Sequence, residues 1–300
     1  MNWETDVSFC DDTIVDSGAI VRLLSDNLRL GNAQAALAER YRRMQSLYPN
    51  ASADDPRWRQ DGCTIADPRS HWDVLLGMPR NVFGADNPTW CGTGGILNCE
   101  DVGIDLPTWM MRRNANPQIR IMVVAEEPKR QGLGTGALWV SSPWAFHSME
   151  YRNHSRNPRI RTIIEAFMQD KEGVVYMTDI RKIYAKGTAH RGFDGTYRSI
   201  IDREIELFKP SVLVGYGSTV LDELRSGLSG HPDGAFARLV CHRPYEDLYN
   251  GVRTLVFAHP SPLNASLGCV ASNVINENPG ITREEAIVKY YTDGEVGQIT

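Results

Sequence analysis

The sequence lacks the features that mark several classes of protein. Its six cysteines include no Cys-x-x-Cys pair, which argues against a dense disulfide framework and against a zinc knuckle. No run of about 18 apolar residues is present, so the sequence predicts no membrane span. A charged and then apolar leader is also absent, and we therefore expect a cytoplasmic protein. The cysteines are Cys10, Cys63, Cys91, Cys99, Cys241 and Cys269.

Two catalytic signatures and a basic net charge are missing as well. The chain has neither a G-x-S-x-G elbow nor a G-x-x-x-x-G-K-[ST] loop, which argues against another α/β hydrolase-like enzyme. The formal net charge is −5, so the field of the whole molecule does not attract nucleic acid. Contacts with a DNA backbone would have to come from local basic clusters, each of which could instead be a solvated face. The candidates are Lys129 and Arg130; Arg181, Lys182, Lys186, His190 and Arg191; and Arg238, His242 and Arg243.

The chain is long and apolar enough for a sizeable core, with 300 residues of which 42% are hydrophobic. Apolar residues at helical spacing predict helices from Ile14 to Leu30 and from Ala33 to Leu47. Residues 51 to 118 are rich in Asp, Pro, Gly, Asn and Trp, with one short helical stretch around His71 to Leu76. We therefore expect residues 1–116 to form a helical and loop-rich extension that packs on a core of residues 117–300.

Strands and helices alternate in the second part of the chain. This alternation predicts parallel pairing with right-handed crossovers. The expected fold class is α/β, a three-layer α/β/α sandwich around a central four-stranded parallel sheet. The predicted strands are Ile119 to Ala125, Val174 to Asp179, Ser211 to Gly215 and Arg253 to Ala258, and the predicted helices are Arg159 to Gln169, Tyr197 to Phe208, Thr219 to Leu228 and a last one with a capping box at Thr282.

Two of these strands end in an acid-base residue beside a proline. The last strand leads into Phe257-Ala258-His259-Pro260-Ser261-Pro262-Leu263-Asn264, and the first leads into Glu126-Glu127-Pro128-Lys129. Proline fixes φ and withholds an N–H, so both segments predict rigid loops. Ligands of open parallel sheets bind at the carboxyl ends of the strands, which suggests one shared site. The alternatives are a stiff turn with a surface histidine and a pair of solvated carboxylates.

Taken together, these segments resemble the uracil-DNA glycosylase superfamily. Its members carry His-Pro-Ser-Pro-Leu after the last strand and a motif such as Gly-Gln-Asp-Pro-Tyr or Gly-Glu-Ala-Pro-Gly after the first. The run from Val174 to Asp179 is similar to the family's second strand, and the run from Ser211 to Ser218 is similar to its third strand with a Gly-Ser phosphate turn. The resemblance covers roughly residues 117 to 270 and implies an enzyme that flips a base out of double-stranded DNA and hydrolyses its glycosidic bond.

The resemblance also implies roles for single residues. His259 would donate a hydrogen bond to O2 of the departing base, an oxyanion-type contribution. Glu127 aligns with the family's water-activating Asp, with Glu126 as the reserve. Trp139 falls near the aromatic that stacks on the base, although a core position fits it nearly as well. The residues expected to contact DNA are Ser218, Ser261, Leu263 (as the wedge that fills the vacated stack), Asn264, Arg181 and Lys182.

Two departures from the family pattern bear on the substrate. Asp179 stands where the family usually has a base-reading Asn, and an ionised carboxylate only accepts hydrogen bonds. It would repel O4 of uracil and accept from the N4 amine of cytosine. Lys129 stands where a Tyr excludes 5-substituted pyrimidines, and a flexible lysine would admit a substituent at C5. Both departures point to a 5-modified cytosine.

The sequence therefore predicts a monofunctional glycosylase similar to the bacterial antiphage members of the superfamily, which remove α-glucosylated 5-hydroxymethylcytosine from phage DNA. Uracil repair and a catalytically weak module that binds modified DNA are the alternatives. Some relatives hold an iron–sulfur cluster, but Ile183 and Tyr184 occupy the place of one ligand, and only Cys91 and Cys99 could begin such a site. We expect no cofactor, no metal and no membrane contact, and the sequence implies no protein partner.

Overall fold

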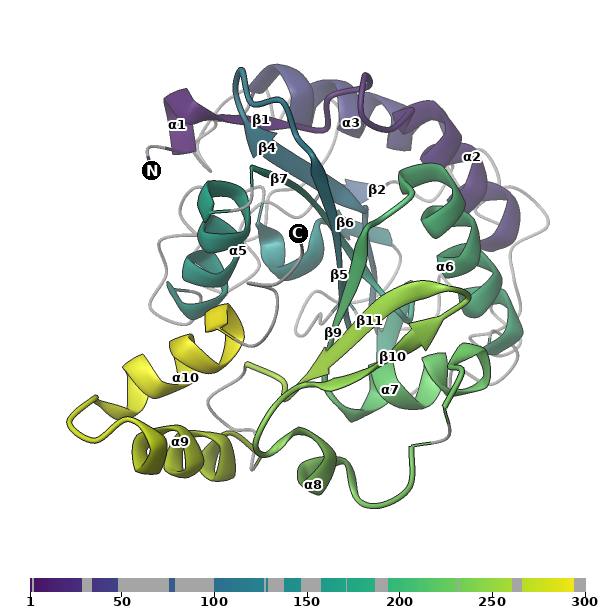
Figure 1. The fold of residues 1–300 in the computed structure, drawn as a ribbon. Coiled ribbons are helices and arrows are strands. Elements are labelled where there is room, and N and C mark those ends of the chain that lie inside the picture. Colours follow the sequence, from purple (N-terminus) through teal and green to yellow (C-terminus); the bar gives the residue numbers. More distant parts are fainter. Residues whose placement is uncertain are drawn as a thin grey trace.

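A mixed β-sheet organises the fold in a computed structural model of the protein (Figure 1). The structure describes residues 1, 3–28, 34–47, 76–78, 100–126, 128, 138–146, 158–170, 172–186, 194–230, 232–260 and 266–293. Within these ranges the sheet has seven strands. In spatial order they are β1 (Val7–Phe9), β4 (Thr108–Arg112), β7 (Gly173–Asp179), β5 (Ile119–Ala125), β9 (Val212–Tyr216), β11 (Val252–Phe257) and β10 (Tyr245–Tyr249).

The four inner strands are parallel. β5 lies between β7 and β9, and β9 pairs in turn with β11. Their apolar side chains are almost all buried, as expected for strands that are covered on both faces. The four strands predicted from the sequence form the centre of a larger mixed sheet, because β4 and β10 add antiparallel strands on either side and β1 extends the sheet beyond β4.

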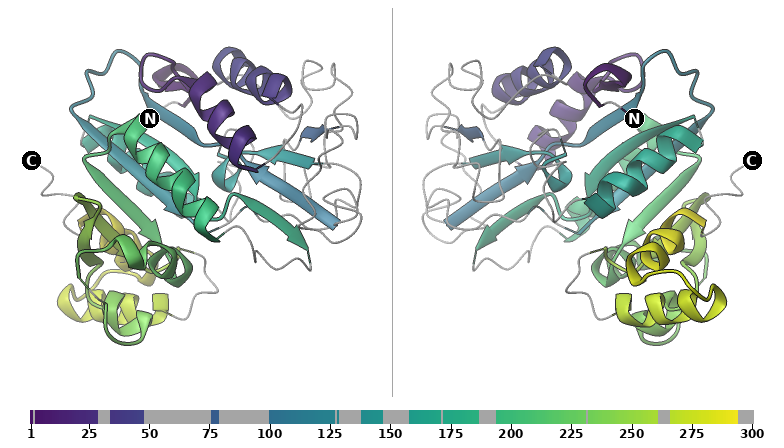
Figure 2. Two further views of the ribbon diagram at one scale, coloured as in Figure 1. Left: turned by 90° about the vertical axis from the view of Figure 1, so that its right-hand side faces the viewer. Right: turned by 90° about the vertical axis from the view of Figure 1, so that its left-hand side faces the viewer.

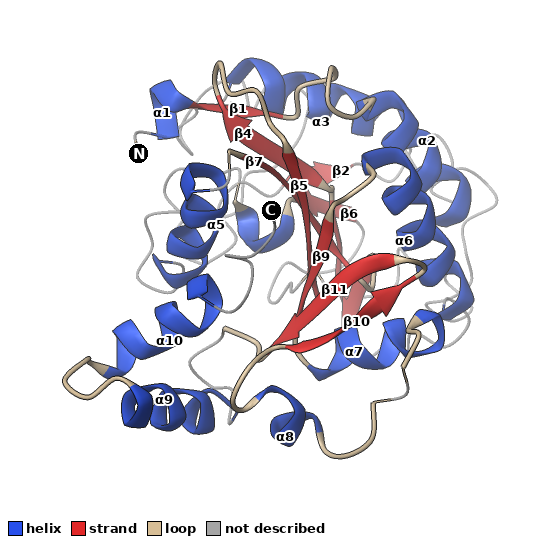
Figure 3. Cartoon of the chain, viewed as in Figure 1, coloured by secondary structure: helices blue, strands red, loops and turns tan. Residues whose placement is uncertain are grey.

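Helices cover both faces of this sheet (Figures 1 and 2). The helix α5 (Pro158–Asp170) lies on one face, and α6 (Asp194–Phe208) lies on the other. The outer helix α2 (Ser17–Leu28) packs on α6, and α10 (Arg283–Asp293) packs on α5 and on α9 (Ser266–Glu277). The remaining described helices, coloured blue in Figure 3, are α1 (Trp3–Asp6), α3 (Gln34–Leu47), α7 (Ser218–Leu224), α8 (Phe236–Val240) and the short 3-10 turns η7 (Pro143–Ala145) and η8 (Arg225–Gly227).

The segment before residue 117 is joined to the sheet itself. It supplies the strands β1 and β4, and the indole of Trp109 in β4 stacks on the ring of Tyr176 in β7 at 5.9 Å. The hydroxyl of Tyr41 in α3 donates a hydrogen bond to the carbonyl of Pro107 at 2.7 Å. Most of the predicted stretch around His71 to Leu76 lies outside the described residues. The described residues 76–78 form the short strand β2 (Leu76–Met78).

A second sheet forms beside the first. Its order is β2, β6 (Leu138–Ser141), β3 (Glu100–Asp105) and β8 (Ile183–Lys186). The sequence patterns did not predict it, because its strands are short and separated by long connections. In the part of the chain that is described, no helix has both the length and the apolar character needed to cross a bilayer.

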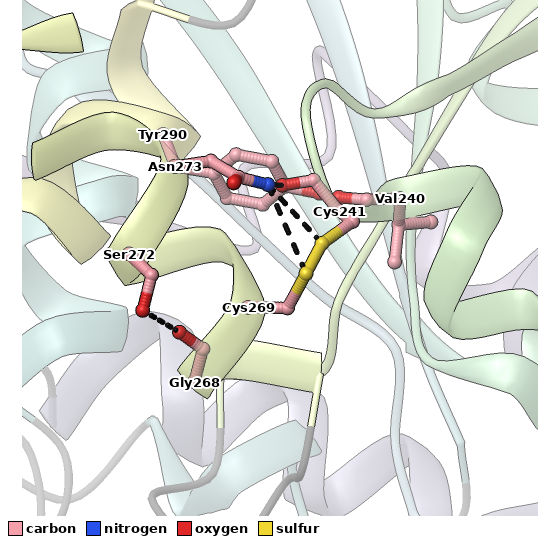
Figure 4. Close-up of a disulfide and its surroundings, with 7 residues drawn as sticks. All are labelled: Val240, Cys241, Gly268, Cys269, Ser272, Asn273 and Tyr290. Carbon is pink, nitrogen blue, oxygen red and sulfur yellow. Dashed lines mark hydrogen bonds between the residues drawn. A yellow bond between two sulfur atoms is a disulfide. The ribbon is translucent and has the colours of Figure 1, made fainter. Parts of the chain in front are cut away.

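Among the described residues, a disulfide links two segments that are distant in the sequence. Cys241, which follows α8, is bonded to Cys269 in α9, 28 residues later (Figure 4). Closing a loop of this size stabilises a fold by about 3 to 4 kcal/mol in the chain-entropy model. Cys10 is a free buried thiol, and burial raises its pKa to about 12. The absence of a Cys-x-x-Cys pair thus did not exclude a single bridge.

The predicted capping box at the start of α10 is confirmed. The backbone N–H of Thr282 donates to Glu285 Oε2 at 2.7 Å, and the backbone N–H of Glu285 donates to Thr282 Oγ1 at 3.2 Å. These reciprocal bonds satisfy donors that would otherwise lack a partner at the helix start. They fix the point at which α10 begins.

Replacing Thr282 with alanine should lower the free energy of unfolding by about 1 kcal/mol, because the cap loses its side-chain acceptor. Urea denaturation checks this value. Thr292→Ala is the matched control, since the Thr292 hydroxyl bonds the Val288 carbonyl within the same helix, and alanine is the better helix former. Equal losses in the two variants would contradict the role of the cap.

Candidate active site at the carboxyl ends of the parallel strands

The ends of β9 and β11 lie in direct contact. The backbone N–H of Gly217 donates to the Phe257 carbonyl at 2.9 Å, which continues the parallel pairing past the strands. The imidazole of His259 packs against Gly217, where an added Cβ would lie 3.5 Å from the His259 Cβ. Gly217 has φ of 98°, a conformation that favours glycine. His259 is half-buried, and the exposed Ser218 begins α7 next to it.

The ends of β5 and β7 are joined in the same way. The N–H of Ile180 donates to the Ala125 carbonyl at 2.8 Å, and the N–H of Arg181 donates to the Glu126 carbonyl at 3.0 Å. The side chain of Glu126 accepts from Thr219 Oγ1 in α7 at 2.7 Å. Glu126 therefore connects the exits of β5, β7 and β9.

The guanidinium of Arg181 is held by a carboxylate on α7. Its Nε lies 3.0 Å from Glu223 Oε1, and both side chains are partly exposed. A partly exposed arginine can still face a phosphate, so the predicted DNA contact of Arg181 stays a prediction. The predicted contact of Ser218 has the same standing. Together with His259, these residues share one edge of the sheet.

Asp179 ends β7 opposite Ala125 and is only 2% exposed. The neighbouring Lys182 is fully buried, and its ammonium donates to Glu204 Oε2 at 2.9 Å and to Thr178 Oγ1 at 2.5 Å. The prediction that Lys182 binds DNA is wrong, because a side chain with no exposed surface and two internal acceptors does not face a phosphate. The lysine instead forms an internal ion pair behind Asp179.

Burial sets the titration of this ion pair. Loss of hydration lowers the pKa of Lys182 and raises the pKa of Glu204, while their mutual attraction opposes both shifts. Asp179 also attracts the Lys182 ammonium and opposes the lowering of its pKa. Each buried charge therefore depends on the other, as expected where desolvation is large.

Aromatic side chains gather beneath the strand ends. Tyr216, at the end of β9, contacts the rings of Phe257 and Tyr291, with centroid distances of 6.0 Å and 5.8 Å. Trp144 in η7 meets Tyr216 edge-on at 5.9 Å. Trp144 also has φ of 52°, a conformation that costs a non-glycine residue energy and is common at functional sites. Sequence reasoning missed Trp144, for which the only signal was its place after a serine-proline pair.

Trp139, the aromatic that the sequence suggested, belongs to β6 of the second sheet. Its backbone pairs with Gly103 and Gly77, and its side chain is outside the description. The other predicted site residues outside the described residues are Glu127, Lys129, Ser261, Leu263 and Asn264. Their roles stay predictions. Among the described residues, no group of three or more His, Cys, Asp or Glu side chains is placed to hold a metal ion.

A family model matches residues 113–284, which is more than half of the chain, and the family is the uracil DNA glycosylase superfamily. The chain belongs to the uracil DNA glycosylase superfamily. Among proteins of curated function, none matches the chain significantly. Membership indicates DNA glycosylase activity with DNA as the substrate. The matched residues include the exits of all four parallel strands, whereas most of α10 lies outside them.

Breaking the buried ion pair of this glycosylase-superfamily fold tests its energetics. Lys182→Met leaves Glu204 buried without its cation and should cost about 3 to 5 kcal/mol of stability in urea denaturation. The double variant Lys182→Met with Glu204→Leu removes both charges of the pair and should recover part of that loss, because Asp179 still loses the neighbouring ammonium. A single variant as stable as the wild type would contradict the pairing, and so would a double variant as unstable as the single one.

The loss should also depend on pH. Burial raises the pKa of Glu204 above its value in the unfolded chain, so protonated Glu204 favours folding at low pH and this contribution disappears as pH rises. The Lys182→Met variant lacks the ammonium that opposes this rise in pKa, so relative to the wild type it should lose less stability at about pH 5 than at about pH 8. Unfolding curves at the two values check the sign, and a larger loss at the acid value would contradict it.

Proposed function

We propose that the protein hydrolyses the N-glycosidic bond of a 5-modified cytosine in double-stranded DNA and leaves an abasic site. The best candidate for the base is α-glucosyl-5-hydroxymethylcytosine of phage DNA, which would make the protein an antiphage enzyme. One observation supports this proposal: the buried carboxylate of Asp179, at the end of β7, lies at the same edge of the parallel sheet as the half-buried His259, which follows β11.

The preference for cytosine over uracil follows from the chemistry of Asp179. A carboxylate offers only acceptors, so it pairs with the N4 amine of cytosine and repels O4 of uracil. The buried ammonium of Lys182 lies close enough to interact with Asp179, and a neighbouring positive charge favours an ionised carboxylate. In a site with little water, an unmatched acceptor is costly, which makes such a group selective.

Hydrolysis requires charge stabilisation on both products of the bond. The imidazole of His259 donates a hydrogen bond to O2 of the base as negative charge develops there. A carboxylate of the Glu126-Glu127 pair orients water toward the cationic sugar. Glu126 already accepts from Thr219, so we assign the water to Glu127 and a supporting role to Glu126. We assign admission of the C5 substituent to Lys129, because a flexible lysine replaces the tyrosine that excludes such substituents elsewhere in the family.

A panel of duplexes separates the candidate substrates. The duplexes carry cytosine, uracil, 5-hydroxymethylcytosine or its α-glucosylated form, and mass spectrometry identifies the base released. We expect release of the glucosylated base and none of unmodified cytosine, because an enzyme that removed the ordinary genomic base would be lethal to its own cell. If abasic sites formed only in the uracil duplex, this result would contradict the modified-cytosine proposal. Tight binding without release would favour a sensor module.

Asp179→Asn tests the reading residue directly. The amide replaces one acceptor with a donor, so excision of the modified cytosine should fall by at least about tenfold, the equivalent of 1.4 kcal/mol. Asp202→Asn on α6 is the matched control, since Asp202 accepts hydrogen bonds from Tyr249 and Asn250. Unchanged excision by Asp179→Asn would count against base reading at this position.

His259→Ala should lower kcat by about 100- to 1,000-fold, the usual cost of removing one preorganised electrostatic donor. Glu127→Ala should have a comparable effect, and Glu126→Ala a smaller one. Single-turnover kinetics on the preferred duplex give these values. If Glu126→Ala lowered kcat far more than Glu127→Ala, our assignment of the two glutamates would be reversed.

A further inference from the structure

The chain leaves the sheet at Ala258, the residue before His259. The last bond of the parallel ladder joins the Gly217 N–H to the Phe257 carbonyl at 2.9 Å. Ala258 is fully buried and lies past this bond. Buried peptide groups need hydrogen-bond partners, so some element other than the sheet has to hold the peptide that precedes His259.

Two adjacent tyrosines of α10 supply these partners. The hydroxyl of Tyr291 donates to the Ala258 carbonyl at 2.7 Å. The N–H of Ala258 donates to the hydroxyl oxygen of Tyr290 at 3.4 Å. Burial raises the pKa of both hydroxyls, so both carry their protons at neutral pH. The two rings also pack on Phe257, at 5.4 Å and 5.5 Å.

A third contact holds the residue after His259. Arg159 in α5 donates through Nη1 to the Pro260 carbonyl at 2.6 Å. The rest of its guanidinium forms a bidentate pair with Glu284 of α10, at 2.8 Å and 2.6 Å. These bonds lower the pKa of Glu284. A bidentate pair of this kind holds the guanidinium in one orientation and also balances its charge.

We call Tyr290, Tyr291 and the Arg159–Glu284 pair the clamp. Hydrogen bonds connect the clamp to the segments that the disulfide joins. The Tyr290 hydroxyl donates to the Val240 carbonyl at 2.8 Å, one residue before Cys241. Asn273 of α9 donates to the Cys241 carbonyl at 3.1 Å, and Figure 4 shows Asn273 and Tyr290 beside the bridge. Helix α10 is therefore tied to α8 and α9 as well as to the backbone at His259.

We infer that α10 is the positioning element of the active site and that its clamp fixes the imidazole of His259 by holding the backbone of the residues on both sides, Ala258 and Pro260. This inference rests on the role of His259 in the proposed function. Most of α10 lies outside residues 113–284, the part of the chain that matches the family model. Misplacing a catalytic group by about 1 Å can cost 100-fold in rate.

Tyr291→Phe is the sharpest test, because it removes one hydroxyl and keeps the ring. Tyr41→Phe is its matched control, since the Tyr41 hydroxyl is also buried and also donates to a backbone carbonyl at 2.7 Å. We expect Tyr291→Phe to lower single-turnover kcat about 10- to 100-fold while Kd for the duplex changes less than about twofold. Tyr41→Phe should lose similar stability and keep its kcat.

The ion pair gives a second variant with its own control. Glu284→Gln weakens the hold of α10 on Arg159 and should lower kcat in the same direction as Tyr291→Phe. Glu246→Gln is the control, because Glu246 bonds Arg253 at 2.7 Å in a comparable partly exposed pair. Its kcat should equal that of the wild type.

NMR tests the positioning of His259 independently of turnover, and therefore separately from the proposed function. The NMR signals of the His259 ring, assigned by comparison with His259→Gln, should shift in Tyr291→Phe and stay in place in Tyr41→Phe. If ring signals and kcat respond alike in the two variants, the clamp is only structural and the inference fails. If the ring signals shift as expected but no duplex of the panel loses a base, the positioning stands and the proposed function fails.

Discussion

The arrangement of the site depends on hydrogen bonds that join neighbouring parallel strands just past their carboxyl ends. The bonds from Ile180 to Ala125 and from Gly217 to Phe257 carry the ladder one step beyond the apolar strands, so the first polar residues of each loop start from fixed positions. Parallel strands open toward ligands at this edge. The same constraint places Glu126 against α7 and His259 against Gly217. Rigid strand ends of this kind are suited to chemistry that needs preorganised groups and little movement during reaction.

Charge burial is the second requirement of the site. A carboxylate that reads a base works best where water is scarce, yet a buried carboxylate is costly without a positive charge nearby. Lys182 supplies that charge, and Glu204 on α6 balances it. Loss of Lys182 would leave the carboxylates of Asp179 and Glu204 buried without a cation. Lys182, which the sequence suggested as a contact with DNA, is instead part of an internal ion pair. The tyrosines of α10 contact the backbone beside His259, since both hydroxyls bond the peptide groups of Ala258.

The sequence predicted the centre of the fold better than its edges. Ile119–Ala125 was predicted with the bounds observed because a strand buried on both faces is a continuous apolar run. β10 was missed because Tyr245–Tyr249 is an edge strand with neither an apolar run nor a polar-apolar alternation, and two acidic residues follow its first tyrosine. The positions of Asp179 and His259 followed from motifs at strand ends. The Lys182–Glu204 pair and the Tyr291 contact did not, since 22 residues separate the first two, 33 separate Tyr291 from Ala258, and only tertiary packing brings each pair together.

The central claim is that Asp179 and His259 act on one everted nucleotide. A crystal structure with a duplex whose target is a non-hydrolysable 2′-fluoro analogue of the modified cytidine tests it most directly. The account predicts the flipped base within hydrogen-bond distance of both side chains, its amine on Asp179 and its O2 on the imidazole of His259. A base bound at another edge of the sheet, or one that reaches His259 while Asp179 stays sealed from it, would contradict the account.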